Sequence, residues 1–298
     1  MSDSSDLLHR FLLPDAHVRG AHVRLDATWK HILSHASYPE AVEALLGEAL
    51  VASALLSAHT KVEGRLSLQA RSSSALRTLF AECTAAGTLR GIARLADGEV
   101  PPEDLASLGS DAMLAVTIEN PGLGGGEPMR YQGLVPLESP TLSGALEDYF
   151  DRSEQLPTRL ILAADGERAA GLLLQALPGA GSDDDGWNRI SLLAATLGRN
   201  ELLDLPADIL LTRLFHQETL QDLGAKPLQF GCSCSQGRVE DMLRALGREE
   251  AEAAAGASVS GQAEIICEFC GKHYHLSGSE IDQLFLAPPA VTPSSRLQ

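Results

Sequence analysis

Near its carboxyl end the chain reads Cys232-Ser233-Cys234 and, beyond residues 235–266, Cys267-Glu268-Phe269-Cys270. Two cysteine pairs on separate turns can converge on one ion, and four thiolates satisfy the soft, tetrahedral ligand preference of Zn²⁺. The pattern therefore predicts one zinc ion per reduced chain, bound by Cys232, Cys234, Cys267 and Cys270.

The segment between the two pairs supports a metal-dependent fold. Such a short segment buries too little apolar surface to hold a domain together, whereas zinc contributes ~10–16 kcal/mol to the folding of small zinc modules. We expect the module to be folded with metal and unfolded without it. Its one apolar helical face consists of Val239, Met242, Leu243 and Leu246, and Gly247 is expected to end the helix.

Two interpretations of this zinc site stay open at this point. Four-cysteine modules are commonly structural zinc sites and nothing more. The Cys232 and Cys234 pair favours a redox switch, because two thiols one residue apart close a strained, easily reduced ring when they are oxidised. Metal-bound thiolates are also the nucleophilic form that peroxide and hypochlorous acid attack.

The composition disfavours several classes of function. With 298 residues, of which 44% are hydrophobic and 21% charged, the chain has room for one large globular domain and a smaller one. Its net charge of −17 disfavours nucleic acids and anionic membranes as partners, since both need a basic protein surface. The sequence has no nucleotide-binding fingerprint, Ser-His-Asp order or HExxH motif, so we expect neither ATP use nor enzymatic activity.

The start of the chain, residues 1–6, is acidic and lacks the basic and apolar regions of a signal peptide. The longest apolar stretch, residues 41–58, carries Glu43 and Glu48, which favours a buried helix over a membrane span. We therefore expect a cytoplasmic protein, whose thiols stay reduced.

Residues 1–178 alternate helix-like and strand-like segments, which predicts an α/β (α+β) domain with a mixed sheet packed by helices. Asp165-Gly166 is a strong hairpin signal between two of the strands. Helices are expected at 39–59, 75–85 and 142–150, and strands at 65–70, 88–95, 112–118, 129–135, 159–163 and 169–175.

A change of composition at residues 178–186, which are rich in Gly and Asp, predicts a domain boundary. We expect an N-terminal α/β domain over 1–178, a helical connector over 179–229, a zinc redox-switch domain over 230–286 and a disordered tail over 287–298. The apolar faces of the connector helices are expected to contain Trp187, Ile190, Leu193, Ala194, Leu197, Ile209, Leu210 and Leu214, with Arg213 beside them.

Other features have simpler interpretations. His273 and His275 lie beside the second cysteine pair, but four cysteines already complete a zinc shell. Cys83 lies in a stretch expected to be helical and is interpreted as a small buried hydrophobe. Residues 122–126 lack the Lys and Ser/Thr of a phosphate loop and predict a hairpin loop, and the acidic residues 183–185 predict a solvated linker.

The cysteine pattern resembles the redox-switch zinc site of the 33-kilodalton heat-shock chaperone family. Further segments resemble the signature motifs of that family, in the same order, from about Phe11 to Phe285. These segments are Tyr131-Gln132-Gly133-Leu134-Val135, residues 146–158 (LEDYFDRSEQLPT), residues 171–175 (GLLLQ), residues 213–218 (RLFHQE) and residues 267–274 (CEFCGKHY).

The resemblance implies a redox-regulated, ATP-independent holdase chaperone that is inactive while zinc is bound to its reduced cysteines. Oxidation in such a protein would pair Cys232 with Cys234 and Cys267 with Cys270, release the zinc, unfold the switch domain and destabilise the connector. The active form would bind unfolding client proteins under oxidative stress and would be a homodimer.

Two rival functions stay open. A thiol-disulfide oxidoreductase would use Cys267 and Cys270, although such enzymes usually place this motif at a helix N-terminus within a thioredoxin-like unit. A zinc-ribbon adaptor would bind a protein partner in both the reduced and the oxidised state.

Overall fold

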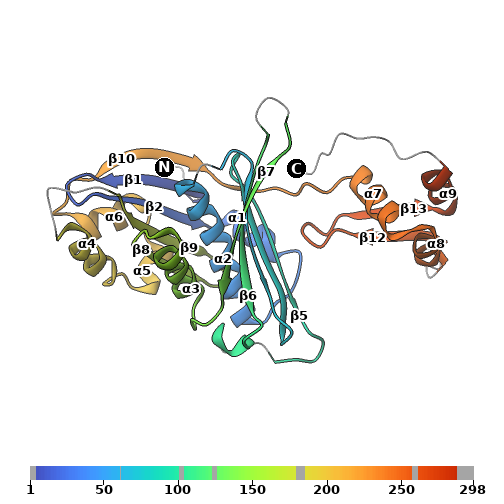
Figure 1. The fold of residues 1–298 in the computed structure, drawn as a ribbon, viewed down its shortest axis with the longest axis horizontal. Helices are drawn as coiled ribbons and strands as arrows, with labels where there is room; N and C mark the ends of the chain where they lie inside the picture. The colour runs from blue at the N-terminus through green and yellow to red at the C-terminus, as the bar shows by residue number, and fades with distance from the viewer. Residues whose placement is uncertain are drawn as a thin grey trace. The chain divides into compact units, whose positions relative to one another are not determined.

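The computed structural model describes residues 5–60, 62–100, 104–122, 126–178, 185–256 and 261–286. The chain forms two compact units, Met1–Gly231 and Cys232–Gln298. Strands and helices occur in both units (Figure 1), which confirms the expected α+β class. The acidic residues 183–184, most of the loop at 122–126 and the tail at 287–298 lie outside the described residues.

The first unit contains a five-stranded antiparallel sheet in the order β10-β1-β2-β9-β8. The predicted hairpin at Asp165 is confirmed, because the Asp165 carboxylate accepts the backbone N–H groups of Glu167 and Arg168 in the turn between β8 and β9, both at 2.8 Å. The strands are β1 (Leu7–Leu13), β2 (Val18–Leu25), β8 (Thr158–Ala164), β9 (Ala169–Ala176) and β10 (Gln221–Pro227).

A second, six-stranded sheet has the order β11-β5-β4-β3-β6-β7. All neighbouring strands are antiparallel except β11 and β5, which are parallel. The strands are β3 (Arg65–Arg71), β4 (Leu76–Thr84), β5 (Thr88–Leu95), β6 (Met113–Asn120), β7 (Met129–Pro136) and β11 (Gln229–Phe230).

The prediction of a helix at residues 75–85 is wrong, because this segment forms strand β4. It pairs with β3 on one side and β5 on the other, so its backbone hydrogen bonds go to neighbouring strands. Short apolar runs fit a buried strand and a helix equally well, and here the long-range pairing decides between them. Cys83 therefore lies on a strand, and it is fully buried as expected.

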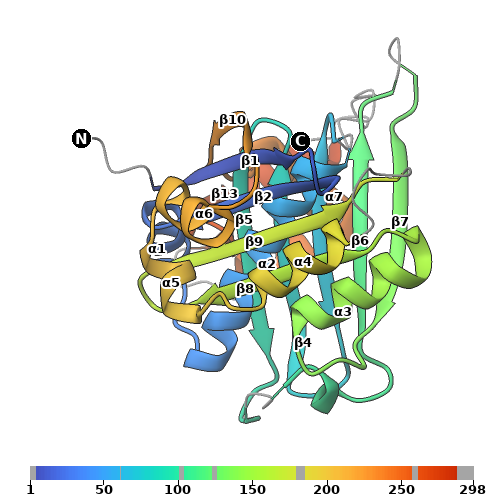
Figure 2. The same cartoon turned by 90° about the vertical axis from the view of Figure 1, so that its left-hand side faces the viewer.

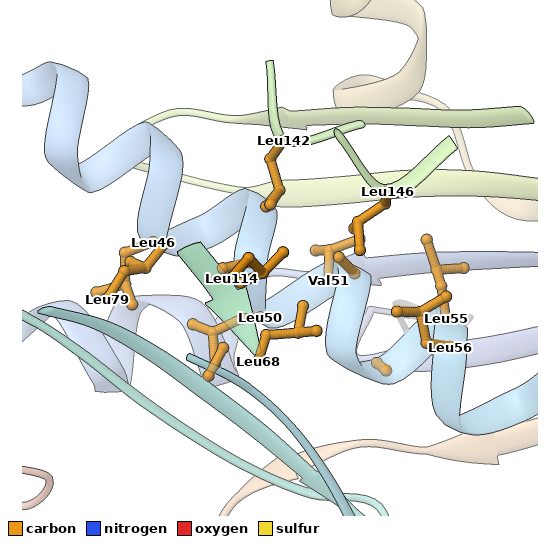
Figure 3. Packing of buried hydrophobic residues seen from close by; sticks show 14 of the residues in the cluster. Leu46, Leu50, Val51, Leu55, Leu56, Leu68, Leu79, Leu114, Leu142 and Leu146 are labelled. Atoms are coloured by element: carbon orange, nitrogen blue, oxygen red, sulfur yellow. The ribbon is translucent and has the colours of Figure 1, made fainter. Parts of the chain in front are cut away.

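Helix α2 (Glu40–His59) packs against strands of both sheets. Figure 3 shows Leu46, Leu50 and Leu56 of α2 among Leu68, Leu79 and Leu114 of the six-stranded sheet. On the other side, Gly47 lies against the β8–β9 hairpin, where a Cβ atom would overlap that of Ala164. The helix is long and apolar enough to pass for a membrane span, but it is mostly buried, which confirms the prediction of a core helix.

The remaining helices of this unit are α1 (Ala27–Leu33), α3 (Leu142–Tyr149), α4 (Gly186–Ala194), α5 (Arg199–Asp204) and α6 (Ala207–Phe215), with short turns at Ala106–Leu108 and Phe150–Glu154. Helices α4, α5 and α6 cover the five-stranded sheet on the side facing the viewer in Figure 2. Ile190 and Leu210 are buried there, but Ile209 and Arg213, expected beside the core, are exposed. Residues 185–229, the described part of the expected connector, belong to the first compact unit.

The second unit consists of α7 (Gln236–Leu246), α8 (Arg248–Gly256), β12 (Gln262–Ile266), β13 (His273–Ser277) and α9 (Gly278–Leu286). Val239 and Leu243 of α7 are buried, whereas Met242 and Leu246, expected on the same face, are exposed. Gly247 has φ +107° and ends α7, as predicted. The core of this unit is small, and it includes Ala251, Ala255, Ala263, Tyr274, Leu276, Ile281 and Leu284.

One buried histidine in the first unit has two ring nitrogens without a hydrogen-bond partner among the described residues. His22 on β2 is 1% exposed, and neither ring nitrogen has a hydrogen-bond partner within the described residues. Burial, together with the nearby His9 and Arg24, lowers the pKa of His22 to about 3. The folded chain therefore resists protonation of this ring more strongly than the unfolded chain does.

We expect His22 to make the first unit less stable in mild acid. Its folded pKa lies below the unfolded value of about 6.5, so its contribution to stability is complete above pH 6.5 and falls as the pH drops toward 3. Between pH 7 and pH 5 this group should lower the free energy of unfolding by about 1–2 kcal/mol.

The measurement is urea unfolding at both pH values, followed by the fluorescence of Trp29 and Trp187. His22→Leu should lose this part of the pH dependence, and the exposed control His216→Leu should keep it. An equal pH dependence in His22→Leu and the unmodified chain would contradict the assignment.

Candidate metal centre

Two turns of the chain carry the four clustered cysteines. Cys232 and Cys234 lie in the loop between β11 and α7, and Cys267 and Cys270 lie in the turn between β12 and β13. The second pair joins two strands and does not begin a helix, unlike the arrangement typical of thiol-disulfide oxidoreductases.

The loop with the first pair is fixed by the start of α7. Ser235 is the N-cap of this helix, and its side chain accepts the backbone N–H of Arg238 at 3.3 Å. The Arg238 guanidinium reaches back and donates to the carbonyl oxygen of Ser233 at 3.2 Å and to its hydroxyl at 2.6 Å. Ser233 is the residue between the two cysteines, so these hydrogen bonds fix the backbone conformation from which the side chains of Cys232 and Cys234 project.

The turn with the second pair is held by its own backbone. Cys267 N–H donates to the carbonyl of Lys272 at 2.9 Å, which closes the hairpin. The carbonyl oxygen of Cys267 accepts the backbone N–H groups of Cys270 at 3.3 Å and Gly271 at 2.7 Å. Gly271 has φ +65°, a left-handed conformation that glycine adopts without a steric penalty.

These turns bring the four sulfur atoms within 4.8 Å of one another. The Sγ atoms of Cys232 and Cys267 are 3.6 Å apart, and those of Cys234 and Cys270 are 3.3 Å apart. Zn–S bonds of about 2.3 Å place the sulfur atoms of a regular tetrahedron about 3.8 Å apart. The arrangement therefore fits a single ion held by four thiolates, and the chain can hold a metal ion here.

The electrostatics of the cluster also favour a cation. Burial raises the pKa of Cys232 and that of Cys270, and at Cys270 the hydrogen bonds with the other three thiols add to this rise. At Cys234, burial opposes ionisation but is outweighed by the Tyr274 hydroxyl and the other thiols, which lower its pKa to about 7. One thiolate is thus favoured, while four close negative charges would repel each other unless a metal ion compensated them.

The sulfur atoms lie at the margin of a small apolar core. All four cysteines are only partly buried and none forms a disulfide in this structure. Cys234 and Cys267 pack against the cluster that includes Val239, Leu243 and Tyr274. The thiols are thus accessible to small reagents and also connected to the packing of the unit.

The other candidates from the sequence lie elsewhere. Cys83 hydrogen-bonds with Ser57 at 3.6 Å in the core of the first unit, and burial raises its pKa. His273 and His275 do not join the four cysteines but form a separate exposed group with Glu264. Asp185, the described part of the acidic run, precedes α4.

Two residues that shape the cluster, Arg238 and Tyr274, were assigned no role from the sequence, although Tyr274 ends one of the signature-like segments. Arg238 follows Cys234 by one helical turn, and that spacing next to an N-cap serine is the signal that could have found it. Tyr274 alternates with His273 and His275 along β13, so its inward direction follows only from the pairing of β12 with β13.

Two of the signature-like segments meet in the first unit, far along the chain from the cysteines. The hydroxyls of Tyr131 and Tyr149 are 3.1 Å apart, and each donates to Glu154 at 3.0 Å. A Cβ atom at Gly133 would lie 2.5 Å from the Tyr149 hydroxyl, so glycine permits this close approach. These residues fix β7 against α3 and the turn that follows it.

Comparison with known proteins gives consistent matches. The model of the family described as Hsp33 protein matches residues 6–277. The 33 kDa chaperonin of Nitrosococcus oceani is 45% identical over 283 residues, 95% of each chain. The 33 kDa chaperonin of Hahella chejuensis is 43% identical over 287 residues, 95% of this chain and 98% of that one. The crystal structure of the 33 kDa chaperonin (heat shock protein 33 homolog) of Thermotoga maritima covers 94% of this chain and 97% of its own, with a TM-score of 0.75 at 21% identity, and so shares the fold.

Substitution of the clustered cysteines should remove the metal. Cys232→Ser and Cys270→Ser each replace a soft thiolate with a hydroxyl that stays protonated near neutral pH, so tight binding should be lost. Elemental analysis of the reduced, dialysed chain should fall from about one ion per chain to near zero. Cys83→Ser is the matched control and should retain the ion; full retention in either of the first two variants would contradict the assignment.

Proposed function

The chain belongs to the Hsp33 protein family, and on this basis we propose that it is a redox-regulated, ATP-independent holdase chaperone. Its relatives are named chaperonins, which supports a chaperone role. The observation that carries the redox switch is the group of four free, partly exposed thiols. They are the groups through which an oxidant would act on the fold of the second unit.

Zinc is the metal that the donor set favours. Four cysteine sulfurs form a soft, closed shell of the kind that binds zinc in structural sites. Cys232, Cys234, Cys267 and Cys270 would hold one ion per reduced chain, and the ion would keep all four sulfurs as thiolates. The bound ion would supply cross-linking of the two turns, while the packing of α7, β12 and β13 aims the sulfur atoms.

Oxidation would convert the four cysteines into two disulfides, Cys232–Cys234 and Cys267–Cys270. For each disulfide, two zinc-bound thiolates would give up two electrons, and one peroxide molecule would take up these electrons and two protons from the solvent to form two water molecules. The close sulfur contacts at rest run between the motifs, from Cys232 to Cys267 and from Cys234 to Cys270. Disulfides within each motif would leave no bond or shared ion between the two turns, because all four thiolates would then be withdrawn from the zinc.

Loss of the metal would leave the second unit with too little buried apolar surface to stay folded. Its core consists of single side chains from short elements, several of them alanines. A core of this size contributes little against the conformational entropy of the ordered chain. We therefore infer that oxidation unfolds the second unit.

Unfolding of the second unit would weaken the pairing of the edge strands β10 and β11, which belong to the two sheets of the first unit. β10 pairs with β1 at one edge, and β11 pairs with β5 at the edge of the other sheet. Gly231 N–H donates to the carbonyl of Leu89 at 3.0 Å, and Cys232 follows directly. Edge strands with pairing on one side open readily once the adjoining chain is disordered.

The apolar faces of the connector would then become available to clients. Ile190 and Leu210 are buried at rest, and Trp187, Leu193 and Leu197 are half-buried against the same cluster. Exposure of such a contiguous patch would bind the apolar segments of unfolding proteins. The net charge of −17 would keep the complexes dispersed.

Edge strand β7 supports client binding in the first unit as well. Met129, Tyr131 and Leu134 on this strand are large apolar side chains that are more than half exposed. An exposed edge strand offers backbone hydrogen bonds together with side-chain contacts to an extended segment. We propose that clients bind without ATP, in the cytoplasm, under oxidative stress, that the active form is a homodimer, and that no reaction, nucleic acid or membrane is involved.

Oxidation should unfold the second unit and leave the first unit folded. Hydrogen exchange on the peroxide-treated chain should show lost protection at residues 232–286 and retained protection in α2 and in strands β3 to β6, which have their own core. Cys83→Ser should respond like the unmodified chain. Protection lost evenly along the whole chain would contradict a modular switch.

The oxidised chain should suppress the aggregation of a heat- or denaturant-unfolded protein without ATP, and the reduced chain should not. Light scattering of an unrelated aggregating protein measures this. Equal suppression by both forms would leave a chaperone without a switch. Suppression by neither form would contradict the holdase function.

A further inference from the structure

A second group of metal-binding side chains lies on the hairpin formed by β12 and β13. The ligand atoms of Glu264, His273 and His275 lie within 4.8 Å of one another. His273 Nδ1 is 2.7 Å from Glu264 Oε1, and the rings of His273 and His275 stack with their centroids 6.3 Å apart. The group is exposed and shares no residue with the four-cysteine cluster.

Strand register puts all three side chains on one face of the hairpin. Glu264 pairs with His275, and Ile266 pairs with His273. Residues directly opposite each other, and residues two apart on a strand, point to the same side. The other face carries Ala263, Tyr274 and Leu276, which are buried in the core of the unit. The three potential ligands therefore face solvent on a backbone that the core holds in place.

The geometry is close to that of a bound ion. Zn–N and Zn–O bonds of about 2.0–2.2 Å bring ligand atoms to about 3.4 Å from each other in a tetrahedron. The Glu264–His273 contact of 2.7 Å is shorter than this, and all three ligand atoms lie within 4.8 Å of one another, so their separations span the value for a bound ion. An ion between these two atoms would take the place of the proton that they now share.

A cross-strand ion pair accounts for Glu264 and His273 but not for His275. An exposed pair of this kind contributes little to stability. The second imidazole adds a nitrogen donor on the same face, which gives the donor set of two histidines and one carboxylate found in open zinc sites. Three protein ligands leave further positions for water, unlike the closed shell of four sulfurs.

We propose that Glu264, His273 and His275 form a second, solvent-open site for a divalent transition-metal ion such as Zn²⁺. Imidazole and carboxylate donors suit zinc, nickel and copper ions and do not select magnesium or calcium. An ion at this site links β12 to β13, and these are the strands whose connecting turn carries Cys267 and Cys270. The site thus lies on the hairpin that positions half of the four-cysteine cluster.

The test is equilibrium dialysis of the full-length reduced chain against excess Zn²⁺, followed by elemental analysis. The unmodified chain should hold two zinc ions, one at the cysteines and one at the new site. His275→Gln removes one nitrogen donor without breaking the Glu264–His273 contact, and it should hold one ion. His216→Gln, which removes an exposed histidine of the first unit, is the matched control and should hold two.

A thiol-reactive mercurial reports the cysteine-bound ion separately. The mercurial should release one ion from every variant. Release of this ion from His275→Gln shows that the four-cysteine cluster of this variant is intact and that its second unit is folded. The proposal is overturned if the unmodified chain holds no more zinc than His275→Gln does. It is also overturned if the control loses the second ion, because that ion would then lie elsewhere.

Discussion

The convergence of four sulfur atoms is the constraint on which the second unit depends. The two turns that carry them are separated by α7 and α8, and the apolar cluster beneath them contains several alanines, which contribute little buried surface. In the first unit, α2 alone buries a row of leucines against two sheets. The core of the first unit is thus large and that of the second is small, so chemistry at sulfur would affect the stability of the second unit more.

Much of this arrangement could be predicted because the signals are local. The helix from Glu40, the hairpin at Asp165 and the paired cysteines each depend on residues close together in the sequence. Strand β4 was predicted as a helix, since an apolar run of this length has no period that separates the two structures. β10 was not predicted as a strand, because its residues are nearly all exposed and therefore show no alternating apolar pattern. Its partner β1 is also more than 200 residues away in the sequence.

Prediction at the cysteine cluster was limited in the same way. Four clustered cysteines identify the donor atoms, but the Tyr274 hydroxyl and the separate group of Glu264, His273 and His275 follow from the register of β12 with β13. A shift of that register by one residue would turn Tyr274 to solvent and the histidines to the core. The hydroxyls of the signature-like residues Tyr131 and Tyr149 both donate to Glu154, and no local pattern in the sequence predicts these contacts.

Burial separates the cysteine of the first unit from the four cysteines of the second in expected reactivity toward an oxidant. Cys83 is fully buried on β4 and burial raises its pKa, so little reactive thiolate forms in the first unit. The four remaining cysteines are partly exposed, and at Cys234 the Tyr274 hydroxyl and the neighbouring thiols lower the pKa to about 7 despite burial. An oxidant therefore meets reactive sulfur only where the fold relies on that sulfur. Under the proposed switch, the first unit would keep its core and the exposed β7 edge, while the second unit would change state.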